Sequence, residues 1–143
     1  MRTIFFTLLS LSLFGCGSVP NQQSTGEIGV VLTNVYPENP IEIEVTPEGE
    51  NLVPKTGETE SIGSLSFSLT SPSGNAMMSV KNSSQSTIKY DLYMVDNSGR
   101  LHYTSSCPLM PGLSVFESWP HFIPEIIVAN ARILDENQGY VCQ

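Results

Sequence analysis

The sequence has few positive charges and few charges of any kind. Its 143 residues include 6 Lys and Arg against 14 Asp and Glu, a net charge of −8, and only 14% are charged. Nucleic acids and anionic lipid surfaces both attract basic proteins, so this balance argues against a nucleic-acid partner and against electrostatic adhesion to lipid. The length allows one domain and excludes an enzyme on a large α/β scaffold.

Long hydrophobic runs are also absent. The longest apolar run, residues 4–14, is broken only by Thr and Ser and follows the basic start Met1-Arg2-Thr3. It is too short to cross a bilayer core of roughly 30 Å as a helix. A short basic segment followed by a short apolar run is typical of a signal peptide, which we expect over residues 1–15.

The apolar run ends in Leu13-Phe14-Gly15-Cys16. This motif resembles the lipobox of bacterial lipoproteins. The resemblance implies cleavage after Gly15, a diacylglyceryl group on the Cys16 thiol and acylation of the new amino group. Several acyl chains on one residue attach a protein almost permanently to a membrane. A secretory signal peptide with an incidental cysteine is the alternative.

The organisation that follows is a signal peptide, a lipidated cysteine with a polar tether over residues 16–26, and one domain over residues 27–143. Gly17 stands where an Asp resembles the inner-membrane retention signal of enteric lipoproteins, so the sorting rule implies the outer membrane. We expect the domain to face the periplasm.

Cysteine is scarce, and the few cysteines are informative. With Cys16 lipidated, Cys107 and Cys142 remain. An oxidising compartment favours a disulfide between them, which would tie the C-terminus to the body of the fold, whereas two reduced thiols are the alternative. These cysteines and the two histidines, His102 and His121, lack the spacing of a metal site. We expect no metal and no cofactor.

Alternating apolar and polar residues predict strands, most clearly over 41–45, 64–70 and 87–96. Turns rich in Gly and Pro separate them. The pattern favours an all-β, immunoglobulin-like antiparallel sandwich of two sheets with about seven to nine short strands. Residues 46–61 are expected to form a long loop. Residues 125–134 could begin a helix at Pro124, but three consecutive β-branched residues favour a strand.

A resemblance supports this fold. Val80-Lys81-Asn82, the Tyr-containing segment 87–96 followed by Gly99, and Pro111-Gly112 before residues 113–116 are similar to immunoglobulin-like FxLYD modules and to YcfL-like small lipoproteins. It covers roughly residues 78–134. It implies an immunoglobulin-like fold and says little about function, because these motifs are general features of sandwiches.

None of the matches to catalytic motifs in this sequence supports an enzymatic function. Ser86 and Lys89 match the S-x-x-K spacing, but Lys89 falls in a strand pattern and the motif works at a helix start. His102 has no evident acidic partner or nucleophile in the sequence, so a structural role is favoured. The acidic residues between Glu38 and Glu60 lack the spacing of a calcium loop and indicate a solvated face. We expect no enzyme.

The segment from Trp119 to Pro124 is the candidate for recognition. It gathers Trp119, His121 and Phe122 between and beside two prolines. Aromatic anchors dominate interface energetics, and prolines reduce the entropy lost on docking. The alternative is that Trp119 and Phe122 plug the open end of the sandwich.

The sequence therefore predicts a membrane-anchored, non-enzymatic module that binds or scaffolds another protein of the bacterial envelope. The alternative is a surface-tethered inhibitor or adhesion module that engages a foreign protein or glycan. The lipidated Cys16 would make the membrane contact in both cases.

Overall fold

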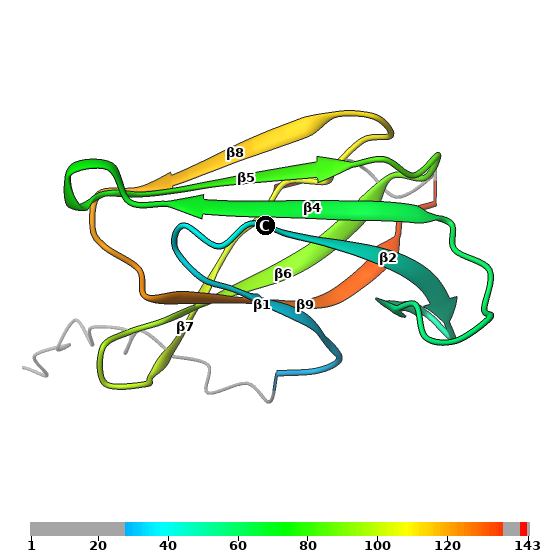
Figure 1. Cartoon of the computed structure of the whole chain (residues 1–143), viewed down its shortest axis with the longest axis horizontal. Coiled ribbons are helices and arrows are strands. Elements are labelled where there is room, and N and C mark those ends of the chain that lie inside the picture. The colour runs from blue at the N-terminus through cyan, green and yellow to red at the C-terminus, as the bar shows by residue number, and fades with distance from the viewer. Residues whose placement is uncertain (1–27, 136–140, 143) are drawn as a thin grey trace, which may run out of the picture.

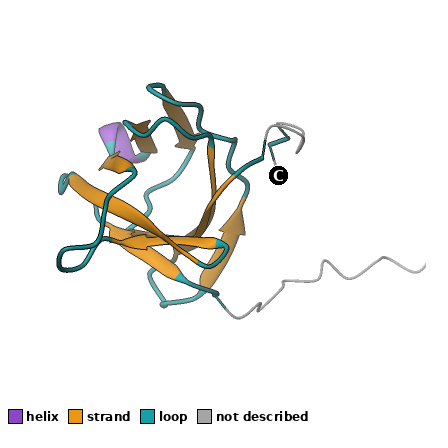
Figure 2. Ribbon diagram, turned by 90° about the vertical axis from the view of Figure 1, so that its right-hand side faces the viewer, coloured by secondary structure: helices purple, strands orange, loops and turns teal. Residues whose placement is uncertain are grey.

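The structure is a computed structural model that describes residues 28–135 and 141–142. The described chain forms two antiparallel sheets packed face to face (Figures 1 and 2). This confirms the predicted all-β, two-sheet sandwich. The expected signal peptide, Cys16 and the tether lie outside the described residues.

Nine strands make up the two sheets. They are β1 (Val31–Val35), β2 (Ile41–Glu48), β3 (Asn51–Pro54), β4 (Gly63–Thr70), β5 (Ala76–Asn82), β6 (Ile88–Val95), β7 (Leu101–Thr104), β8 (Ser114–Trp119) and β9 (Glu125–Ile133). One sheet has the order β1-β9-β6-β7 and the other the order β3-β2-β4-β5-β8. The chain changes sheets four times, after β1, β5, β7 and β8, which is how a sandwich encloses one core.

The segment that allowed both a helix and a strand is strand β9, as predicted. It pairs with β1 on one side and β6 on the other. Ile126 and Val128 are buried in the core, while Ile127 between them is half-buried. This alternation is the period of a strand, and β-branched side chains suit it.

The prediction of a long loop over residues 46–61 was wrong in its first half. Strand β2 continues to Glu48, and β3 returns beside it after a tight turn at Gly49, whose φ is +62°. Leu52 of β3 is buried in the core. The two prolines that suggested a loop are tolerated: Pro54 lies on an edge strand, and Pro47 lies beyond Val45, where the pairing of β2 with β4 ends.

Apolar side chains from the inner faces of both sheets form the core. Phe67 of β4 and Tyr90 of β6 meet edge to face, with ring centroids 6.4 Å apart. The Tyr90 hydroxyl is buried without a hydrogen-bond partner among the described residues, and burial raises the pKa of this phenol. The ring therefore stays neutral, and its packing rather than its hydroxyl holds the sheets together.

The buried side-chain amide of Asn82 lies at the end of the sandwich where β5 connects to β6. The Asn82 side-chain nitrogen donates to the carbonyl oxygens of Ser86, at 2.8 Å, and Leu109, at 3.1 Å. The Asn82 side-chain oxygen accepts from the Ser84 amide at 2.9 Å and the Ser84 hydroxyl at 2.7 Å. We call these four residues the Asn82 cluster. It fixes the segment that carries Leu109 against the β5–β6 connection.

The two cysteines of the domain lie together. The Cys107 and Cys142 sulfur atoms are 2.10 Å apart, at disulfide distance, as the sequence predicts. Cys107 precedes Leu109 by two residues, so the link joins the C-terminal end of the chain to the segment that the Asn82 cluster holds.

Candidate functional site

The segment predicted for recognition connects β8 to β9 and so crosses from one sheet to the other. Its residues differ sharply in burial. Ile123 is 2% exposed and belongs to the core, whereas Phe122 is 49% exposed and His121 is also exposed. Ile123 therefore anchors the connection in the core, while the side chains of His121 and Phe122 face solvent.

Trp119 lies apart from these two side chains. It is half-buried, packs against the core, and its indole nitrogen lies 3.4 Å from the Thr104 hydroxyl on β7. Trp119 thus bridges the open edge between the two sheets. Trp119 therefore packs against the core, while Phe122 and His121 are exposed.

A shallow hollow gathers Phe122 and His121 with residues of the β6–β7 hairpin. Its lining consists of Met94, Val95, Asp96, His102, His121, Phe122 and Ile123. The structure therefore brings both histidines of the chain to one end of the sandwich. Sequence reasoning had treated them separately.

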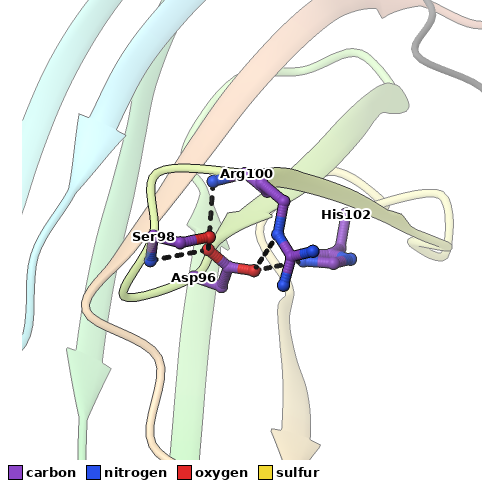
Figure 3. Close-up of polar contacts among 4 residues, drawn as sticks. All are labelled: Asp96, Ser98, Arg100 and His102. Carbon is purple, nitrogen blue, oxygen red and sulfur yellow. Dashed lines mark hydrogen bonds and ion pairs between the residues drawn. The ribbon is translucent and has the colours of Figure 1, made fainter.

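Asp96 is the centre of the polar side of this hollow (Figure 3). Its carboxylate accepts hydrogen bonds from the Ser98 amide at 2.8 Å, the Ser98 hydroxyl at 2.6 Å and the Arg100 amide at 3.0 Å. Arg100 Nε lies at 3.1 Å and His102 Nε2 at 2.9 Å. We call these four residues the Asp96 cluster. The Asp96-Asn97-Ser98-Gly99 turn creates it, because Gly99 takes a φ of +79° and folds the chain back.

The hydrogen bonds of the Asp96 cluster favour the ionised form of the Asp96 carboxyl. The hydrogen bond from His102, followed by those from Ser98 and from the Arg100 amide, holds the pKa of the Asp96 carboxyl well below its usual range. An ionised carboxylate only accepts hydrogen bonds, so the contacting nitrogen of His102 carries a proton. At neutral pH the hollow therefore has an ionised carboxylate beside the Arg100 guanidinium.

The arrangement is not that of a catalytic triad. The Ser98 hydroxyl donates to the Asp96 carboxylate rather than to the imidazole. In a Ser-His-Asp triad the imidazole stands between the other two groups and takes the proton of the serine. The geometry of the Asp96 cluster instead fixes a hairpin turn and orients His102.

The contact between Lys89 and Ser106 is buried. Lys89 does not meet Ser86, as the S-x-x-K spacing would require, but donates to the carbonyl and hydroxyl oxygens of Ser106. The Ser106 hydroxyl in turn donates to the Tyr90 carbonyl oxygen, and Ser106 is only 1% exposed. Because this hydroxyl is enclosed and its proton is engaged, we assign the contact to structure.

The acid partner of His102 was missed at the sequence level. The signal was present in the hairpin register, which pairs Val95 with Leu101 and Met94 with His102. Asp96 lies two residues after Met94, the cross-strand partner of His102, so the Asp96 and His102 side chains lie diagonally opposite each other on the same face of the hairpin. Counting outward from the turn would have found the pair.

The acidic segment behaves as a surface. Glu44 forms an ion pair with Lys55 at 3.1 Å, and Glu42 accepts the Ser64 hydroxyl at 2.6 Å. Within residues 28–135 and 141–142, no three His, Cys, Asp or Glu side chains are grouped so that they could hold a metal ion. The same part of the chain contains no helix long and apolar enough to cross a membrane.

Comparisons of the whole chain with protein-family models, with curated proteins and with solved structures find no match.

Proposed function

We propose that the mature protein is a lipid-anchored lipoprotein of the bacterial outer membrane. In this proposal its sandwich domain is a non-enzymatic module that binds or scaffolds another envelope protein on the periplasmic side. The lipobox-like motif that ends at Cys16 supports the anchor. The exposed Phe122 beside the buried Ile123 is the single observation that supports the binding role.

Exposed aromatic rings on rigid backbone are favourable anchors for a partner. Pro120 and Pro124 restrict the backbone on both sides of Phe122, and Ile123 holds the middle of the segment in the core. Little conformational entropy is then lost on docking. A large buried area and a rigid aromatic anchor are what interface hot spots share.

The Asp96 cluster supplies a polar rim to this anchor. His102 and Asp96 line the same hollow as Phe122, and Arg100 is mostly exposed beside them. Interfaces commonly surround an apolar centre with polar groups that exclude water and set orientation. A partner surface with one apolar side chain and both a donor and an acceptor would match this end of the sandwich.

The test compares two exposed phenylalanines. Phe122→Ala and Phe116→Ala are each introduced into the full-length lipoprotein, which is then recovered from gently solubilised membranes after cross-linking. We expect Phe122→Ala to reduce recovery of one specific protein at least tenfold, because losing an anchor costs about 2 kcal/mol or more of binding free energy. Phe116 lies on β8 outside the hollow and is the matched control. Unchanged recovery with Phe122→Ala would contradict the proposed docking surface.

A further inference from the structure

The two outer faces of the sandwich differ in chemistry. Strands β2, β4, β5 and β8 turn mostly hydroxyl and charged side chains outward, and only Met77 and Phe116 interrupt them. The polar residues of that face are Glu42, Glu44, Ser64, Ser66, Ser68, Thr70, Ser79, Lys81, Ser114 and Ser118. A sheet face that meets water is normally polar in this way.

The outer face of the four-stranded sheet carries an apolar and aromatic patch, with Asn34 beside Ile127 and Glu125 beside Val95 as its polar neighbours. Its register places Tyr103 beside Tyr93 and Leu101 beside Val95, and Tyr93 is paired in turn with Ile127. The rings of Tyr93 and Tyr103 pack edge to face with centroids 5.6 Å apart. Leu101 and Tyr103 remain 44% and 50% exposed. We call these five residues, together with Tyr36, the aromatic face.

The carboxylates on this side are already engaged. Glu125 accepts a hydrogen bond from the Tyr36 hydroxyl at 3.0 Å. Asp91 accepts one from the Asn130 amide at 2.9 Å and lies 3.8 Å from the Arg132 guanidinium. The charge of Asp91 is therefore partly balanced within the sheet and Glu125 keeps a hydrogen bond, so the aromatic face can approach an apolar surface at lower desolvation cost.

The described chain enters the sandwich through this same sheet. Ile28 leads into β1, an edge strand of the four-stranded sheet, and in Figure 1 the blue start of the chain lies on the lower side, where that sheet forms the lower layer. Ile28 follows Cys16 by twelve residues. Twelve residues reach at most about 40 Å when fully extended, so a lipid on Cys16 keeps the domain close to the bilayer.

The size of the aromatic face favours a weak contact. Four strands over about five residues cover on the order of 300 Å². A stable protein interface needs about 800 Å² from each partner. A patch of this size is insufficient for a lasting dimer in solution, but a short tether raises the effective concentration of the bilayer surface and makes a weak contact persistent.

From these observations we propose that the aromatic face rests on the lipid surface next to the anchor. The inference depends on the lipid anchor of the proposed function and adds an orientation to it. Tyrosine suits this place, because its ring enters the headgroup region while its hydroxyl stays hydrated. The contact itself is apolar. Because anionic lipid repels a protein with a net charge of −8, we expect the contact on zwitterionic lipid. The hollow at Phe122 lies next to this face and shares Val95 with it, while Phe122 and His121 come from the β8–β9 connection outside the face.

The experiment compares one position on each outer face. Leu101→Cys and Phe116→Cys are made in the lipidated protein, and the new thiol is labelled with an environment-sensitive fluorophore under conditions that keep Cys107 and Cys142 joined. Both side chains are exposed, at 44% and 70%, so either label should leave the fold intact, which circular dichroism verifies. The labelled proteins are inserted into zwitterionic phosphatidylcholine and phosphatidylethanolamine vesicles with nitroxide-bearing lipid.

We expect severalfold stronger quenching by the nitroxide at position 101 than at position 116, with a blue-shifted emission at 101 only. Equal quenching at the two positions, in protein that floats with the vesicles, would overturn the orientation and leave the anchor intact. Protein that fails to float would overturn the anchor and the orientation together. A blue shift at 101 that follows protein density and is insensitive to the nitroxide would assign the face to a second copy of the chain, and would also overturn the proposal.

Discussion

The Asn82 cluster and the Asp96 cluster are built in the same way and placed differently. In each, one short side chain makes several hydrogen bonds to its neighbours where a strand ends, but Asn82 both accepts from Ser84 and donates to two carbonyl oxygens, whereas Asp96 only accepts. Asn82 is neutral and fully buried, whereas Asp96 is charged and lies at the surface. Comparing the two clusters therefore separates the effect of burial on stability from the effect of hydrogen-bond geometry.

The difference decides what each cluster contributes. Groups that lose their partners inside the protein cannot turn to water, so they incur the full desolvation cost. Groups at the surface regain water when a hydrogen bond breaks, so the net change is small. We therefore expect the Asn82 cluster to stabilise the fold and the Asp96 cluster to shape the hollow beside Phe122.

The largest effect should come from Asn82→Ala. The substitution leaves the Ser84 amide without its partner, whereas the Leu109 carbonyl keeps the Ile88 amide and the Ser84 hydroxyl keeps the Ser86 carbonyl. At roughly 1–3 kcal/mol for the orphaned amide and about 0.5–1.5 kcal/mol for each of the other three lost hydrogen bonds, we expect the free energy of unfolding to fall by about 4 kcal/mol. Urea denaturation followed by fluorescence measures it. The exposed turn residue Asn97 supplies the control, since Asn97→Ala should change stability by less than about 0.5 kcal/mol; similar losses in both variants would remove the distinction drawn from burial.

The next effect concerns the link between Cys107 and Cys142, which restrains the segment that carries Leu109. Cys142→Ser should lower the free energy of unfolding by roughly 3–4 kcal/mol, as the chain-entropy estimate gives for a sequence separation of 35. The same variant should leave the Asp96 cluster untouched. Thermal melting of the variant, compared with the reduced native protein, checks the assignment. Two free thiols in unreduced native protein would contradict it.

Trp119 and Phe122, the aromatic residues of the segment predicted for recognition, should differ in how much their substitution lowers stability. Trp119 is half-buried against the core, so Trp119→Ala should cost about 2 kcal/mol, below the range for a fully enclosed ring. Phe122→Ala should cost under about 0.5 kcal/mol, because its ring faces solvent. The melting midpoints of both variants provide the measurement. Equal, severe losses would place Phe122 in the core and remove the docking surface.

The sequence predicts the sandwich well because strand alternation is a local signal. Ile88, Tyr90 and Leu92 are buried on one side of β6, as their spacing predicts. The β2–β3 hairpin was missed because Pro47 and Pro54 are turn signals whose meaning changes at a sheet edge, and edges are set by distant strands.

The candidate site was predicted only in part. The sequence singled out the segment that contains Trp119 and Phe122 and left open whether their rings dock or plug. The contact of His102 with Asp96 follows from the register of the β6–β7 hairpin, but the shared hollow with His121 depends on how this hairpin lies against the β8–β9 connection. Packing between segments of this kind leaves no periodic mark in a sequence.

The smallest expected effect is the pH dependence of the stability that the Asp96 cluster, the cluster at the surface, contributes. Because hydrogen bonds to the ionised form hold the pKa of Asp96 below that of an unfolded aspartate, about 3.9, the cluster stabilises the fold above that pH. The contribution is lost progressively as the pH falls from there through the folded pKa. Asp96→Asn keeps the shape but replaces an acceptor by a donor that faces His102.

We therefore expect Asp96→Asn to be slightly less stable than the native protein at neutral pH, and the two stabilities to converge as the pH falls below about 4. The Asn82 cluster has no titrating group, so the deficit of Asn82→Ala should stay constant over the same range. Urea denaturation at a series of pH values gives both differences. A deficit of Asp96→Asn that persists undiminished in acid would show that the shape of the turn, and not the charge of the carboxylate, is what the Asp96 cluster contributes.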